Sequence, residues 1–145
     1  MKGFAIYTCE FGIIRIDYED EKVIALKKID TSLILPDAKT SFTNNVFLEL
    51  SEYFMGKRKQ FTFAYELNGT QFQKRVWTAL CSIQYGETCS YRDIANAIGN
   101  PNACRAVGMA NNKNPIIIVV PCHRVIGSNK GTSKNFSFLR CTLDL

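Results

Sequence analysis

The stretch NPNACRAVGMANNKNPIIIVVPCHRVIG, residues 100–127, carries most of the information about the fold. Its first part predicts a helix over residues 101–112, with Asn100 as the N-cap and Pro101 at the first position, where a missing N–H costs nothing. The five residues 116–120 are all Ile or Val and predict a fully buried strand that stops at the next proline. We therefore expect a short helix followed by a buried strand.

A cysteine stands directly after that predicted strand, beside the only histidine of the chain. Positive charge from His123 and Arg124 would lower the pKa of the Cys122 thiol, and the thiolate is the nucleophilic form. Adjacent residues of an extended chain point to opposite sides, so Cys122 and His123 can couple only across a turn or through a water molecule. The pattern fits a reactive cysteine, and a buried structural cysteine is the alternative.

Arg105 is the one long cationic side chain in a predicted helix whose other residues are mostly small. Small side chains allow a helix to approach a partner closely. If that partner is DNA, Arg105 could enter the duplex or bind a phosphate; if the helix faces solvent, it is an ordinary surface arginine. The residues alone leave both interpretations open.

The segment before this stretch predicts two further helices. Each begins with the spacing of a capping box, Thr70 with Gln73 and Ser90 with Asp93. We expect Trp77 in the core of the first helix. The second helix and the Arg105 helix are separated by a tight turn, which suggests a helix-turn-helix, although many pairs of core helices have the same pattern.

Residues 1–68 predict a small α+β domain that serves as a scaffold. A helical pattern begins at Asn44, read as its N-cap, and stops at Gly56. Alternation of apolar and polar residues predicts an antiparallel sheet from three segments, residues 4–7, 13–17 and 23–26. Residues 69–145 would then form the second domain.

Charge is distributed unevenly between these halves. Residues 1–68 hold nine Lys/Arg and ten Asp/Glu, whereas residues 69–145 hold nine and three, a balance of +6. A basic half often faces a polyanion, because neutralised phosphates release counterions; an ordinary solvated surface is the alternative. The sequence lacks a signal-peptide pattern and a membrane-length apolar run, so we expect an intracellular protein with six mostly reduced cysteines. With one histidine and no CxxC, we expect no metal.

Motifs across residues 69–128 closely resemble those of the methylated-DNA-protein-cysteine methyltransferases, which are DNA-repair proteins. The most specific are Pro121 to Val125 (PCHRV) and Arg105 to Gly108 (RAVG). The others are Gly69 to Gln73, Val76-Trp77, Tyr85-Gly86, Ser90-Tyr91, Ile94-Ala95, Asn114-Pro115 and Ile126-Gly127. The resemblance implies a ribonuclease-H-like N-terminal domain and a mainly helical C-terminal domain with a helix-turn-helix. It also implies stoichiometric transfer of an alkyl group from O6-alkylguanine, and possibly O4-alkylthymine, to Cys122, without a cofactor.

The resemblance further implies roles for individual residues. His123, acting through a water molecule, would be the base for Cys122, and Asn114 would tie the recognition helix to the active-site segment. Arg105 would enter the base stack from the minor groove while the damaged nucleotide swings out. Near the DNA backbone we expect Tyr91, Arg92, Asn100 and Ser128, and around the flipped base Tyr91, Val125, Phe136 and Ser137. The partner would be double-stranded DNA, bound by a monomer in the cytoplasm, or in the nucleus of a eukaryote.

The C-terminal tail departs from the family pattern. No Gly-Gly pair occurs, and no glutamate follows Glu87, so Asp144 is the expected third member of the chain from Cys122 through His123. A non-enzymatic protein that binds alkylguanine is the main alternative, yet such proteins typically lack the cysteine. A papain-type hydrolase would place its cysteine and histidine far apart in sequence, and a transcription factor would have no use for the PCHRV segment.

Overall fold

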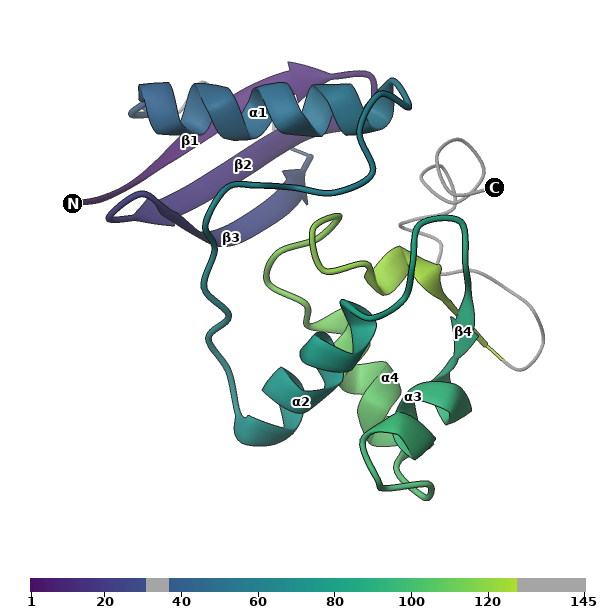
Figure 1. Ribbon diagram of the computed structural model, residues 1–145. Helices are drawn as coiled ribbons and strands as arrows, with labels where there is room; N and C mark the ends of the chain where they lie inside the picture. The colour runs from purple at the N-terminus through teal and green to yellow at the C-terminus, as the bar shows by residue number, and fades with distance from the viewer. Residues whose placement is uncertain (31–36, 128–145) are drawn as a thin grey trace. The chain divides into compact units, whose positions relative to one another are not determined.

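A computed structural model of the chain describes residues 1–30 and 37–127. The chain divides into two compact units, the first Met1–Leu67 and the second beginning at Asn68 (Figure 1). In the described ranges, no helix has the length and apolar character that a bilayer crossing needs.

The first unit is a three-stranded antiparallel sheet with one helix. The sheet order follows the chain, and Ala5 of the first strand lies opposite Ile16 of the second. Figure 1 shows the helix lying across one face of the sheet. The elements are β1 (Lys2–Cys9), β2 (Gly12–Glu19), β3 (Lys22–Ile29) and α1 (Ser41–Phe54). All three predicted strand segments lie inside these strands.

The N-terminus of α1 differs from the prediction. Asn44 is not the N-cap, because Thr40 caps the helix and the first turn begins at Ser41. The Thr40 hydroxyl accepts the amide N–H of Thr43 at 3.1 Å, and the Thr43 hydroxyl accepts the amide N–H of Thr40 at 2.8 Å. This reciprocal pair forms a capping box with threonine in place of the usual Glu or Gln. Gly56, with φ 73°, follows the end of the helix as predicted.

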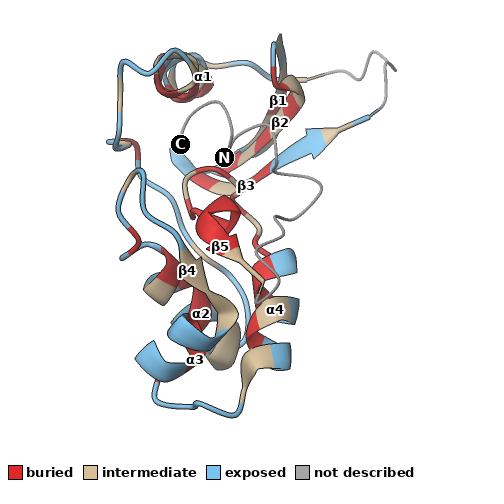
Figure 2. Cartoon of the chain, turned by 90° about the vertical axis from the view of Figure 1, so that its right-hand side faces the viewer, coloured by how far each residue is buried: buried red, intermediate tan, exposed pale blue. Residues whose placement is uncertain are grey.

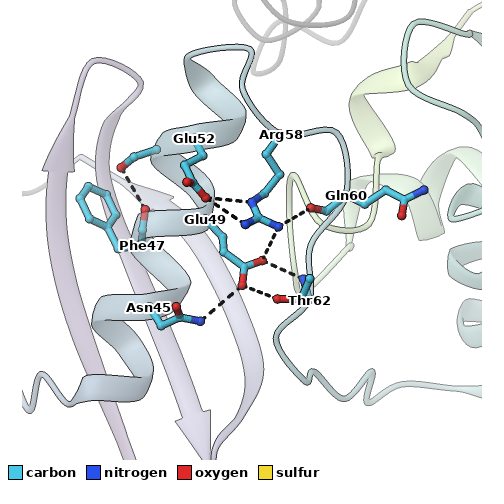
Figure 3. Close-up of polar contacts among 8 residues, drawn as sticks. Asn45, Phe47, Glu49, Glu52, Arg58, Gln60 and Thr62 are labelled. Carbon is cyan, nitrogen blue, oxygen red and sulfur yellow. Dashed lines mark hydrogen bonds and ion pairs between the residues drawn. The ribbon is translucent and has the colours of Figure 1, made fainter.

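One buried carboxylate fixes the chain that follows α1 (Figure 3). Glu49 accepts the amide N–H of Thr62 at 2.7 Å and the hydroxyl of the same residue at 2.6 Å. The guanidinium of Arg58 lies 3.5 Å from Glu49 and also bonds the carboxylate of Glu52. A buried charge is tolerated when it is paired and hydrogen-bonded, so this cluster is a structural feature of the first unit.

The second unit is mainly helical. Its elements are α2 (Gln71–Leu80), β4 (Cys89–Ser90), α3 (Tyr91–Ala97), α4 (Cys104–Asn112), the 3₁₀ helix η1 (Cys122–Arg124) and β5 (Val125–Ile126). Both predicted capping boxes are present, Thr70 with Gln73 and Ser90 with Asp93. Trp77 of α2 is buried as expected, and its indole N–H donates to the carbonyl of Ala110 at 2.9 Å. This bond joins α2 to α4 in the core.

The helix α4 begins later than the sequence predicts. Asn100 is not its N-cap and Pro101 is not its first residue, because the helix begins at Cys104 after Ala103. The amide N–H of Ala103 donates to the carbonyl of Asn100 at 3.0 Å, which closes a separate turn first. Ala103 then has φ −98° and ψ 25°, outside regular helix geometry.

The predicted strand over residues 116–120 is also wrong. Its burial was foreseen correctly for alternate residues, since Ile116, Ile118 and Val120 are buried. However, the segment folds back on itself: the amide N–H of Val120 donates to the carbonyl of Ile116 at 3.1 Å, and Ile118 has φ 75°. The backbone of this segment forms a tight turn and not a strand. Its alternate Ile and Val side chains are buried all the same, which is why the sequence pattern resembled that of a buried strand.

Candidate active site

Cys122 lies in a buried turn directly after this folded-back segment. It begins η1, where the amide N–H of Arg124 donates to the carbonyl of Pro121 at 3.0 Å. The side chains of Cys122 and His123 are only 1% and 2% exposed. The two residues thus lie in a turn and not in an extended chain, which would point them to opposite sides.

Asn114 links the end of α4 to this turn. Its side-chain N–H donates to the carbonyl of Val120 at 2.8 Å, and its side-chain oxygen accepts the amide N–H of Ile116 at 3.0 Å. Both bonds are buried. The side chain also hydrogen-bonds the thiol of Cys122. A single amide therefore holds the chain on both sides of the folded-back segment and contacts the candidate nucleophile.

Burial controls the ionisation of Cys122. Loss of solvent raises the pKa of the thiol to about 11, although hydrogen bonds from Asn114 and from the amides of Cys122 and His123 act in the opposite direction. The sequence predicted a pKa lowered by neighbouring positive charge, and in this structure the effect of burial is larger. The resting protein therefore holds a neutral thiol, and a base must remove its proton during reaction.

Arg124 anchors the turn to the chain that follows α2. Its guanidinium is buried, donates to the carbonyl of Ile83 at 2.8 Å and stands 5.7 Å from the centre of the Tyr85 ring. Sequence reasoning treated Arg124 only as a charge near the thiol. The anchoring role could not be predicted, because Arg124 and Ile83 are 41 residues apart in the sequence and no local pattern connects them.

The same turn is connected to the start of α3 by a small parallel sheet. Val125 of β5 pairs with Cys89 of β4, and Ile126 pairs with Ser90, the N-cap of α3. Tyr91 follows Ser90 immediately. The pairing thus brings Val125 and Tyr91, two predicted pocket residues, to the same region as Cys122.

A groove of about 820 Å³ lies between α3 and α4. Ser90, Tyr91 and Arg92 line one side. The other side is one face of α4, formed by Cys104, Arg105, Gly108, Met109 and Asn112. Figure 2 shows that α4 is buried along one side and exposed along the other. The structure therefore brings together the predicted residues Tyr91, Arg92 and Arg105 on an accessible surface.

Other predicted site residues lie elsewhere. Asn100 is exposed in the turn between α3 and α4 and does not line the groove. Cys122 and His123 are buried and do not line it either. Four of the predicted residues lie outside the described residues, namely Ser128, Phe136, Ser137 and Asp144. Within residues 1–30 and 37–127, no group of three His, Cys, Asp or Glu side chains could hold a metal ion.

Sequence reasoning did not assign Cys104, Met109 or Asn112 to the site, although all three line the groove. Helical periodicity could have found Met109 and Asn112, because positions four and seven residues after Arg105 share its face of the helix. The emphasis on small residues hid Met109, whose side chain is 63% exposed.

Comparison with known families accounts for nearly the whole chain. Residues 71–142 match the DNA binding domain of 6-O-methylguanine DNA methyltransferase, and residues 3–67 match its ribonuclease-like domain. The chain belongs to the 6-O-methylguanine DNA methyltransferase family. A methylated-DNA-protein-cysteine methyltransferase of Methanosarcina acetivorans is 45% identical over 131 residues, which is 87% of this chain and 84% of that protein. An inducible relative of Bacillus subtilis is 54% identical over 68% of this chain and 56% of its own.

Solved structures of the family have the same fold. The O6-methylguanine methyltransferase of Mycobacterium tuberculosis aligns with a TM-score of 0.86 and 36% identity, over 99% of this chain and 91% of that one. A complex of the Mycobacterium tuberculosis protein OGT with DNA aligns with a TM-score of 0.76 and 38% identity, over 88% and 80% of the two chains. These findings confirm three predictions: the family, the α+β fold with its N-terminal sheet, and the class of DNA-repair methyltransferase. DNA as a binding partner is confirmed as well.

Proposed function

We propose that this protein repairs double-stranded DNA by transferring the alkyl group of O6-alkylguanine to the sulfur of Cys122. The observation that carries the proposal is a 1% exposed cysteine, next to the only histidine of the sequence, in a turn connected by β-pairing to an arginine-lined groove. A sulfur so deeply buried cannot reach a base stacked in a duplex. The nucleotide must therefore leave the stack, as in other enzymes that act on bases.

The transfer balances as a single displacement. The sulfur of Cys122 forms a bond to the alkyl carbon while the bond from that carbon to guanine O6 breaks. His123, through a water molecule, takes the thiol proton, and the departing guanine receives a proton. The products are a thioether and an ordinary guanine. Because a thioether is not readily hydrolysed, each molecule acts once, and no cofactor takes part.

The groove would hold the DNA. Arg92 and Arg105 provide positive charge on its two sides, and the described residues that line it include no Asp or Glu. Arg105 enters the minor groove and fills the place of the extruded nucleotide, while Tyr91 contacts the neighbouring phosphate and the base. The Val125 carbonyl reads the base edge. The roles of Asn100, Ser128, Phe136, Ser137 and Asp144 stay predictions.

The proposal gives each of the two parts of the chain a role. Residues 69–145 bind DNA and accept the alkyl group, and residues 1–68 serve as a scaffold. The protein acts as a monomer, in the cytoplasm or, in a eukaryote, in the nucleus. Alkylated guanine in a duplex is its substrate.

Intact-protein mass spectrometry tests the reaction directly. After mixing with a duplex that contains O6-methylguanine, the protein should gain about 14 Da, the mass of one methylene, because a methyl group replaces the thiol hydrogen. Cys122→Ser should gain nothing while still binding the duplex. Cys104→Ser, which removes a groove cysteine, should still gain the methyl group. Binding without any gain of mass in the natural protein would favour a lesion-binding protein instead.

A further inference from the structure

Met109 is an apolar side chain exposed in a cationic groove. It is 63% exposed, and among residues 68–127 it is the one large hydrophobic side chain with high exposure. A single exposed apolar side chain is ordinary on a protein surface, so what distinguishes Met109 is its place in the groove beside Arg105.

Its position on α4 is specific. Met109 follows Arg105 by four residues, so both side chains rise from the same face of the helix. Between them on this face is Gly108, and the Tyr91 ring lies 3.9 Å from the point where a Cβ on Gly108 would stand. Gly108, which has no side chain, therefore leaves room in the groove between the long side chains of Arg105 and Met109.

DNA is the occupant that fits both side chains. The charged groups lining the groove are Arg92 and Arg105, which attract a polyanion, while the apolar Met109 is unsuited to phosphate. Apolar side chains such as methionine are used by minor-groove proteins as wedges between base steps. A protein partner would meet the same methionine beside the positive charges of Arg92 and Arg105, which is a poor match for an apolar docking surface.

We propose that Met109 enters the minor groove beside Arg105 and contacts the bases next to the extruded nucleotide. Arg105 replaces the lost nucleotide, and Met109 covers the apolar base surface that unstacking exposes to water. The inference rests on the proposed function, because it assigns a second DNA-inserting residue to the same groove. It predicts that Met109 matters for duplex substrates and far less for a base that needs no extrusion.

Single-turnover rates with two substrates separate these cases. One substrate is a duplex containing O6-methylguanine, and the other is the free base O6-methylguanine, with Cys122 methylation measured by mass. In Met109→Ala the ratio of the duplex rate to the free-base rate should fall about tenfold or more, because the buried apolar contact is lost. Met109→Leu should restore most of that ratio. Met55→Ala, which removes a side chain 61% exposed in the first unit, should leave the ratio within about twofold of the natural protein.

An unchanged ratio in Met109→Ala would overturn the inference. If neither rate changes, the side chain makes no contact that the duplex needs; if both rates fall equally, the substitution has damaged the fold or the thiol. If the natural protein methylates Cys122 with neither substrate, the proposed function fails; Met109 is then judged by the fluorescence of 2-aminopurine next to the lesion, which should rise less with Met109→Ala than with the natural protein. Equal fluorescence would reject it.

Discussion

At the scale of single residues, the chemistry of the site depends on the pKa of the Cys122 thiol. Its pKa is about 11 in the folded protein because the thiol is buried, whereas a cysteine in an unfolded chain has a value of about 8.5. The thiolate therefore appears at higher pH in the folded protein. This behaviour is suited to a nucleophile that must stay inert until a substrate arrives.

Reaction of Cys122 with iodoacetamide gives a direct test of that shift. In the native protein the rate should rise about tenfold per pH unit from pH 7 to pH 10 without levelling, because the thiolate fraction grows in that proportion below the pKa. In denaturant the same cysteine should level off above about pH 8.5. Peptide mass spectrometry identifies the labelled residue. A plateau near pH 7 in the native protein would mean that positive charge, rather than burial, controls the thiol.

At the scale of elements, Asn114 is the connection between α4 and the reactive turn. Asn114→Ala leaves the Val120 carbonyl and the Ile116 amide without their buried partners, and each such loss costs about 1–3 kcal/mol. The free energy of unfolding in urea should fall by about 2–4 kcal/mol. Asn112→Ala, an exposed asparagine of the same helix, should change it by less than about 0.5 kcal/mol.

A second readout distinguishes positioning from stability alone. Asn114 also hydrogen-bonds the Cys122 thiol in the direction that lowers its pKa. Its removal should therefore raise the pH at which labelling of the native thiol levels off, whereas more frequent opening of a destabilised protein raises the labelling rate at every pH without that shift. A pH dependence unchanged in Asn114→Ala would reject the positioning role.

Elements whose signals are local were predictable from the sequence. The capping boxes at Thr70 and Ser90 need only a residue and its neighbour three positions later, and both are present. The start of α4 was not predictable, because a backbone turn closed by the Asn100 carbonyl delays it to Cys104. The apolar run before Pro121 was misread as a strand, since burial through a tight turn and burial in a sheet require the same Ile and Val side chains.

At the scale of the whole molecule, the motifs were more informative than the periodicity. Spacing alone favoured a reactive cysteine at Cys122 but left a structural cysteine as the alternative, and it left Arg105 between DNA and solvent. The family match covers residues 3–67 and 71–142 and resolves the class of activity. No local pattern could predict which distant segments of the chain meet. Examples are the pairing of Val125 with Cys89 and the hydrogen bond from Arg124 to the carbonyl of Ile83.

The central claim is that one protein molecule repairs one lesion by keeping the alkyl group on Cys122. The most direct measurement is the amount of guanine restored in a tenfold molar excess of duplex carrying O6-methylguanine, followed until the reaction stops. We predict one guanine restored per protein, with the methyl group recovered on the peptide that contains Cys122. Continued turnover beyond one equivalent, no restored guanine, or a methyl group on a different cysteine would contradict the account.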